Sequence, residues 1–184
     1  PEFTQLEFYM AYADYRDVMD LTERMVSGVA QEVRGTTQIT YDGHEIDLAP
    51  PWRRLRMADA IFEATGIDFT KVRDQQTLYE LARERGADVE PTTVWPRIVD
   101  ELMKTFVRPH LIQPTFLIDY PVELSPLAKQ SPESERIVER FQVFIGGIEL
   151  CNAYSELNDP MDQMARFLEQ ARDRAQGDEE AMPI

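Results

Sequence analysis

Long apolar runs and cysteine are both scarce in this sequence of 184 residues. A membrane-spanning helix needs about 20 consecutive apolar residues, so the lack of such a run excludes a membrane span. The single cysteine, Cys151, cannot form a disulfide within the chain, which fits a reducing compartment and predicts a cytoplasmic location. The start, PEFTQLEFYM, has neither a basic end nor an apolar core, which excludes a signal peptide.

Several motifs of catalytic proteins are also missing. The sequence has no phosphate loop of the Walker type and no dinucleotide-binding fingerprint. His44 and His110 have no partner at the spacing of zinc ligands, which favours structural or exposed roles. Cys151 has no histidine near it in the sequence, and Ser125 lacks the glycines of a nucleophile elbow. We therefore predict a small core residue and a turn residue, and no catalytic nucleophile.

Basic residues are few, with 19 lysines and arginines against 34 aspartates and glutamates and a net charge of −15. Such a surface repels phosphate backbones, so a main nucleic-acid-binding surface is not expected. Solubility explains most of the acidic side chains. Some of them could instead serve a cationic ligand or Mg²⁺.

The chain alternates between helix-period and strand-period patterns. These patterns predict a strand over 2–12 and a helix over 15–34, which lies between Asp14 and Gly35 and has the apolar residues Val18, Leu21, Met25 and Val29. A hairpin at Asp42-Gly43, a strand near 51–56 and a helix over 57–65 are predicted next. The remaining predicted elements are two helices within 68–112, a strand from 114, a hairpin at Gly146-Gly147 and a last helix over 161–176. Antiparallel strands with helices beside them indicate an α+β fold. We divide the chain into a first part of the core (1–67), a helical insertion (68–112) and a second part of the core (113–184).

The two ends of the sequence suggest a piece of a longer protein. The chain begins without Met and directly on a strand-like pattern, and it ends on the acidic stretch QGDEEAMPI.

Two predicted strands carry polar side chains on one face. In 2–12, Leu6, Phe8 and Met10 share the apolar face, and the other face holds Phe3, Gln5, Glu7 and Tyr9. In the late strand, Asn152, Tyr154 and Glu156 share a face. If the strands are neighbours, these groups converge on a site that suits a ligand ammonium group. The alternative is that strand faces turned to solvent are polar in any case.

Glu149 has the opposite parity to Asn152 along the late strand, so a regular strand sends it to the other face. A β-bulge near Leu150-Cys151 would bring it round. This hypothesis requires an extra residue in the backbone ladder at that point.

Three strings, PEFTQLEFYMAYADY, PVELSPLAK and RFQVFIGGIELCNAYSELNDP, followed by QGDEEAMPI, resemble class II lysyl-tRNA synthetases over nearly the whole chain. NAYSELNDP in this context separates the lysine enzymes from their aspartate and asparagine relatives. The resemblance implies an antiparallel sheet that carries the active site, flanked by helices. It also implies that residues 1–12 form the second strand of the family's motif 2.

The resemblance also implies roles for individual residues. Phe3 matches a position that stacks on adenine, and Glu149 matches an acidic residue that coordinates Mg²⁺ with ATP. The residues that match the lysine pocket are Glu7, Tyr9, Asn152, Tyr154 and Glu156. Of these, Glu156 matches the carboxylate at the ammonium end and is also placed near the metal and ATP. Gln142 stands where many relatives carry a metal-binding Glu, so the resemblance implies a weaker Mg²⁺ site there.

The implied reaction is attack of lysine on the α-phosphorus of ATP, followed by transfer to tRNA(Lys) by a homodimeric full-length enzyme. Such chemistry depends on positioning and charge stabilisation. The sequence lacks motif 1, the arginine of motif 2 and all of motif 3, so we expect no counter-charge for the triphosphate and no aminoacylation by this chain alone. The alternatives are a truncated, non-catalytic paralogue that binds lysine or a synthetase partner, and a folded fragment without its own function.

Overall fold

The computed structural model describes residues 2–175, 177 and 181. Within them, a five-stranded sheet contains β3 (Arg53–Arg56), β4 (Thr115–Pro121), β5 (Gln130–Ser131), β6 (Ser134–Ile145) and β7 (Ile148–Tyr154). The strands β1 (Gln38–Tyr41) and β2 (His44–Asp47) form a separate hairpin. The α-helices are α1 (Tyr15–Arg34), α2 (Met57–Thr65), α3 (Gln75–Glu84), α4 (Trp95–Leu102) and α5 (Pro160–Ala175). The fold is α+β, as the sequence predicts.

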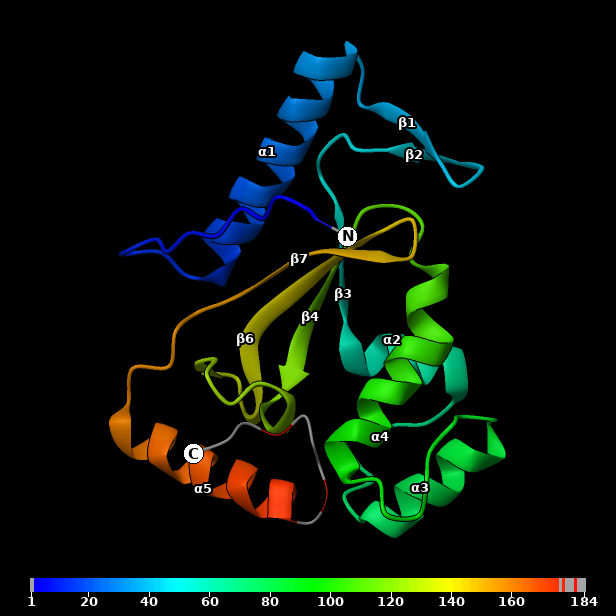
Figure 1. Ribbon diagram of the computed structural model, residues 1–184, viewed down its shortest axis with the longest axis vertical. Helices are drawn as coiled ribbons and strands as arrows, with labels where there is room; N and C mark the ends of the chain where they lie inside the picture. Colours follow the sequence, from blue (N-terminus) through cyan, green and yellow to red (C-terminus); the bar gives the residue numbers. More distant parts are fainter. Residues whose placement is uncertain (1, 176, 178–180, 182–184) are drawn as a thin grey trace.

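The sheet is built around β6, the longest strand. β4 pairs with one edge of β6, and β5 and β7 pair with different stretches of the other. All of these pairs are antiparallel, whereas β3 runs parallel to β4. Figure 1 shows α2, α3 and α4 together on the connection between β3 and β4. A parallel pair requires such a long crossover, which explains the one departure from an antiparallel sheet.

Local signals locate most elements correctly. The carboxylate of Asp14 accepts the backbone N–H groups of Arg16 and Asp17 at the start of α1, and Gly35 ends the helix in a left-handed conformation (φ 75°). The β1–β2 hairpin turns at Asp42-Gly43, where both residues have positive φ, as a type I′ turn requires.

The buried side of α1 differs from the apolar spacing that predicts this helix. Met25 and Val29 are 36% and 57% exposed, while Thr22 and Glu23 are buried. These buried polar groups have partners: the Thr22 hydroxyl donates to the carbonyl of Val18, and the Glu23 carboxylate accepts the backbone N–H of Trp52. The spacing therefore identifies the helix, but tertiary contacts decide which side is buried.

The sheet separates two hydrophobic cores, because neighbouring residues on a strand face opposite sides. Phe116 and Phe141 pack in the core beneath α1, with their rings in an edge-to-face arrangement and their centroids 5.2 Å apart. On the other side, Phe144 packs in a core shared with Ile98 and Leu102 of α4. The predicted insertion thus shares a core with the sheet, and the boundaries 1–67, 68–112 and 113–184 remain a prediction.

After α4, the chain continues as a π-helical turn (Met103–Val107) and a 3₁₀ turn (Arg108–His110). A second 3₁₀ turn (Val122–Leu124) follows β4. No helix among the described residues is long and apolar enough to cross a membrane. The predicted end of the last helix at Gln176 and most of the acidic tail lie outside the described residues.

The predicted strand over 2–12 is wrong, because residues 2–10 adopt neither helix nor strand and a turn follows at 11–12. An extended segment becomes a strand only when a neighbour accepts and donates the ladder hydrogen bonds. The described strands pair among themselves and not with this segment. Alternating side chains alone therefore do not make this segment a strand.

Candidate functional site

The pairing of β6 with β7 places four polar side chains on one face of the sheet. Arg140 lies opposite Tyr154, and Gln142 lies opposite Asn152. Directly opposed residues share a face, and so do residues two apart on a strand. Gln142 is buried, Tyr154 is partly buried and Asn152 is exposed. On this face the Asn152 side chain is therefore accessible to solvent, and the Gln142 side chain is not.

A β-bulge adds Glu149 to this face. Val143 pairs with Cys151, but the next residue of β6, Phe144, pairs with Glu149, so Leu150 is the extra residue. Phe144 is two positions from Gln142 and shares its face. The bulge predicted from the parity of Glu149 is confirmed, and it brings the carboxylate to the side of Gln142.

Hydrogen bonds hold three of these four side chains. The buried Tyr120 hydroxyl donates to Oε1 of Gln142, and Nε of Arg140 donates to Oδ1 of Asn152 over 3.0 Å. The guanidinium of Arg140 also lies 4.6 Å from the centre of the Tyr120 ring. Burial raises the pKa of Tyr120 far above its usual value, so its hydroxyl remains a donor.

Glu149 and Gln142 line a pocket of about 240 Å³ between α4 and the sheet. The same pocket is lined by four cationic residues, Arg97, Lys104, Arg108 and Arg140, and by the acidic Asp100. Lys104 and Asp100 form an ion pair with each other, since Nζ of Lys104 lies 2.6 Å from the carboxylate of Asp100. With Glu149 counted, the lining holds two acidic and four cationic residues. The expectation that a triphosphate finds no counter-charge on this chain stays a prediction.

The cationic residues of this pocket are not among the site residues predicted from the sequence. Arg97, Lys104 and Arg108 are spaced seven and four apart, the spacing of one helix face. That spacing was the available signal. The core that α4 and the turns after it share with the sheet then brings these residues to the pocket that Arg140 also lines.

Glu156 lies beyond the end of β7, where it forms an isolated antiparallel bridge with Ala128. Its side chain is exposed. Seven positions of largely extended chain separate it from Glu149, which corresponds to roughly 20 Å at the rise of a β-strand. Ligands of one Mg²⁺ ion lie within about 2.1 Å of it. Glu149 and Glu156 therefore cannot share an ion in this conformation.

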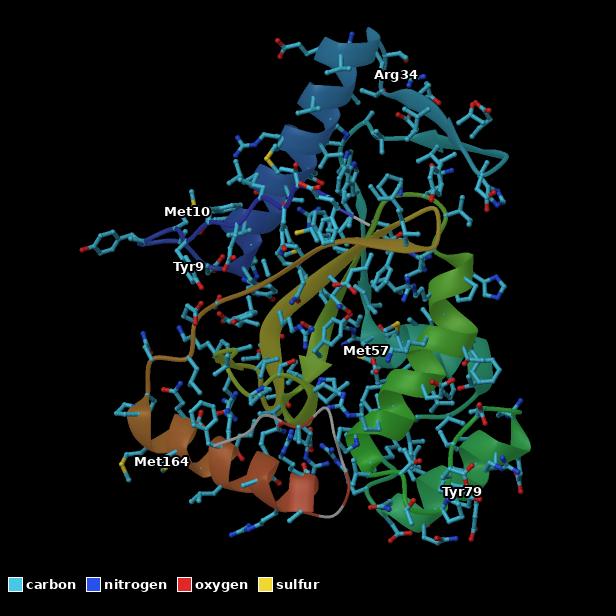
Figure 2. All side chains as sticks on the ribbon, viewed as in Figure 1. Tyr9, Met10, Arg34, Met57, Tyr79 and Met164 are labelled. Carbon is cyan, nitrogen blue, oxygen red and sulfur yellow. The ribbon has the colours of Figure 1, made fainter. Side chains whose placement is uncertain are left out.

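The N-terminal segment reaches the neighbourhood of Tyr154 without joining the sheet. Phe3 and Tyr9 are 82% and 80% exposed, and Glu7 is also exposed. Figure 2 shows Tyr9 on the segment beside the start of α1. The pKa of Tyr154 is raised, first by burial and then by Glu156, with smaller contributions from Tyr9 and Glu7. Three of the predicted lysine-pocket residues, Glu7, Tyr9 and Glu156, thus contribute to the pKa of the same phenol.

The residues predicted to be structural have structural surroundings. Ser125 is buried, and its hydroxyl accepts a hydrogen bond from Arg140. Burial raises the pKa of Cys151, which keeps the thiol protonated and poorly nucleophilic. Among the described residues, no group of three or more His, Cys, Asp or Glu side chains could hold a metal ion by itself.

The whole chain is similar to known proteins. Residues 1–183 match the family model for class II tRNA synthetases (D, K and N). A lysine–tRNA ligase of Chloroflexus aurantiacus is 54% identical over 181 residues, and one of Carboxydothermus hydrogenoformans is 52% identical over 181 residues. A lysine–tRNA ligase of Pelotomaculum thermopropionicum is 50% identical over 183 residues. Each match covers 98% of this chain but only 37%, 37% and 36% of the relatives' own lengths.

Proposed function

The chain belongs to the class II tRNA synthetases of the aspartate, lysine and asparagine group, and on this premise we propose that it acts as a portion of a lysyl-tRNA synthetase. The observation that carries the proposal is identity of 50% or more to three lysine–tRNA ligases along 98% of the chain. The proposed reaction joins lysine to AMP with release of pyrophosphate from ATP and then transfers the lysyl group to tRNA(Lys).

The lysine site of this proposal is the polar face of β7 together with the N-terminal segment. Glu156 provides the carboxylate that pairs with the ligand ammonium group. Tyr154 provides an aromatic wall beside it, which also tolerates a cation. Glu7 and Tyr9 complete the site from the N-terminal segment, and their effect on the pKa of Tyr154 supports this placement.

The ATP site of this proposal lies at the other end of β7. Mg²⁺ usually takes one or two protein carboxylates together with phosphate oxygens and water, and Glu149 is the carboxylate offered here. Gln142 is a weaker ligand, because its oxygen is neutral and already accepts the Tyr120 hydroxyl. The bound ion would neutralise phosphate charge, and the cationic residues of the neighbouring pocket would add to that effect. Phe3 is exposed and available to stack on adenine.

The proposal includes no protein nucleophile, because activation of lysine by ATP depends on holding both reactants in line and on stabilising charge. The resemblance assigns the two arginines that grip ATP, and the surface that builds the homodimer, to segments other than these residues. We therefore expect this chain to bind lysine but to give no lysyl-tRNA by itself.

Calorimetric titration of the chain with lysine tests the proposal. We expect saturable binding that is selective for lysine over norleucine, which lacks the terminal ammonium group. The variant Glu156→Gln should lose most of this affinity because the charge that pairs with the ammonium group is gone. Glu32→Gln, an exposed change on α1, is the matched control and should bind as the parent does. A folded chain that binds both amino acids equally, or neither, would contradict the proposed lysine site.

A further inference from the structure

We propose that Arg140 is a positioning residue that turns the side-chain amide of Asn152 so that its N–H donors face the bound amino acid. This inference rests on the proposed lysine site. It assigns a task to an arginine that does not itself touch the ligand.

The contact between the two side chains determines the orientation of the amide. Arginine has only donors, and its Nε donates to Oδ1 of Asn152 over 3.0 Å. The reversed amide would place its NH₂ group against the guanidinium, donor against donor. Oδ1 of Asn152 therefore faces Arg140, and the NH₂ group is the part of the amide left for a ligand.

The guanidinium is held in place from below. Its Nη1 donates to the carbonyl of Leu124 and to the hydroxyl of Ser125, each over 2.8 Å. Its carbon lies 4.6 Å from the centre of the Tyr120 ring. Three kinds of contact thus fix a planar group whose own freedom is already small.

The segment that anchors Arg140 also supports Glu156. Ala128 bridges to Glu156, and the backbone N–H of Leu157 donates to the carbonyl of Leu127 over 3.0 Å. On its other side, buried Arg166 of α5 donates to the carbonyl of Ala128 over 2.6 Å. Residues 124–128 therefore connect the Arg140 guanidinium, which holds the Asn152 amide, to the backbone at Glu156 and Leu157.

The proposed lysine site therefore has a hydrogen-bond donor at Asn152 and a hydrogen-bond acceptor at Glu156. The Asn152 amide offers its NH₂ donors to a ligand while Arg140 engages its oxygen, so it favours an oxygen acceptor such as a carboxylate. The carboxylate of Glu156 can only accept, so it recognises an ammonium group. A ligand that keeps the ammonium group but lacks the carboxylate should not depend on Arg140.

Two ligands and three variants test this role. L-lysine has both groups, and cadaverine is the same chain without the carboxylate. We expect Arg140→Met to weaken lysine binding roughly two- to tenfold, the effect of one lost hydrogen bond, and not to weaken cadaverine binding. Arg136→Met, a change on the same strand face, is the control and should leave both affinities at the parent value. An equal loss for both ligands in Arg140→Met would overturn the inference, because it would indicate general damage to the site.

Arg140→Lys separates position from charge. The lysine keeps the charge but cannot donate to Asn152, Leu124 and Ser125 together. We therefore expect weaker lysine binding in this variant as well. Binding at the parent level would show that charge alone matters and would overturn the positioning role.

An NMR measurement without ligand keeps this inference separate from the proposed function. The side-chain NH₂ signals of Asn152, identified by their loss in Asn152→Asp, should move toward those of a free asparagine in Arg140→Met. Unchanged signals would overturn the inference. If the parent chain binds neither lysine nor cadaverine, the proposed lysine site fails, and the NMR result alone decides the role of Arg140.

Discussion

Removal of the Tyr120 hydroxyl tests the buried hydrogen bond beneath the polar face. Tyr120 and Gln142 are 2% and 9% exposed, so the hydrogen bond between them is shielded from bulk solvent. Tyr120→Phe leaves Oε1 of Gln142 without that donor, which costs about 1–3 kcal/mol for a buried polar group. The ring remains, and with it the contact to the Arg140 guanidinium. We therefore expect the free energy of unfolding to fall by about 1–3 kcal/mol from this single term.

Urea unfolding followed by tryptophan fluorescence measures this change, because Trp52 and Trp95 are both buried. Tyr79→Phe removes a hydroxyl from a partly buried tyrosine of α3, away from the sheet (Figure 2), and should change stability much less. The double variant Tyr120→Phe/Gln142→Met replaces both partners with apolar groups. It should be less destabilised than the sum of its single variants by about 1–2 kcal/mol. Strict additivity would refute the reasoning.

Three further predictions concern a metal ligand, a helix cap and a buried carboxyl group. Gln142→Glu should tighten Mg²⁺ binding in the presence of ATP, since a carboxylate replaces a neutral oxygen beside Glu149; unchanged affinity in a calorimetric titration would argue against a metal at this position. Asp14→Ala removes the capping box of α1 and should lower the free energy of unfolding by about 1 kcal/mol, and equal urea midpoints would contradict that role. Burial raises the pKa of Asp119 in the folded chain, so ionisation of this carboxyl lowers the free energy of unfolding. The loss of stability is absent below the unfolded pKa of about 3.8 and develops as the pH rises through the folded pKa. Asp119→Asn should therefore gain stability over the parent as the pH rises above about 4, whereas a pH-independent difference would contradict the assignment.

The sequence by itself determined the local structure. Asp14 and Gly35 bound a helix, and Asp42-Gly43 specifies a turn. These features depend on residues within a few positions of one another, through backbone sterics and short-range hydrogen bonds. They are correct because no distant contact has to be known.

The tertiary structure alone decided which groups meet. Residues 2–10 alternate like a strand, but their state depends on whether a partner strand is present, and that partner is not a local property. The pocket beside Glu149 likewise exists only because α4 and the turns after it share a core with the sheet and bring Arg97, Lys104 and Arg108 to it. The orientation of the Asn152 amide depends on Arg140, which lies twelve positions earlier on the neighbouring strand. Contacts between residues far apart in sequence follow from the burial of shared apolar surface, and that energy belongs to the folded chain as a whole.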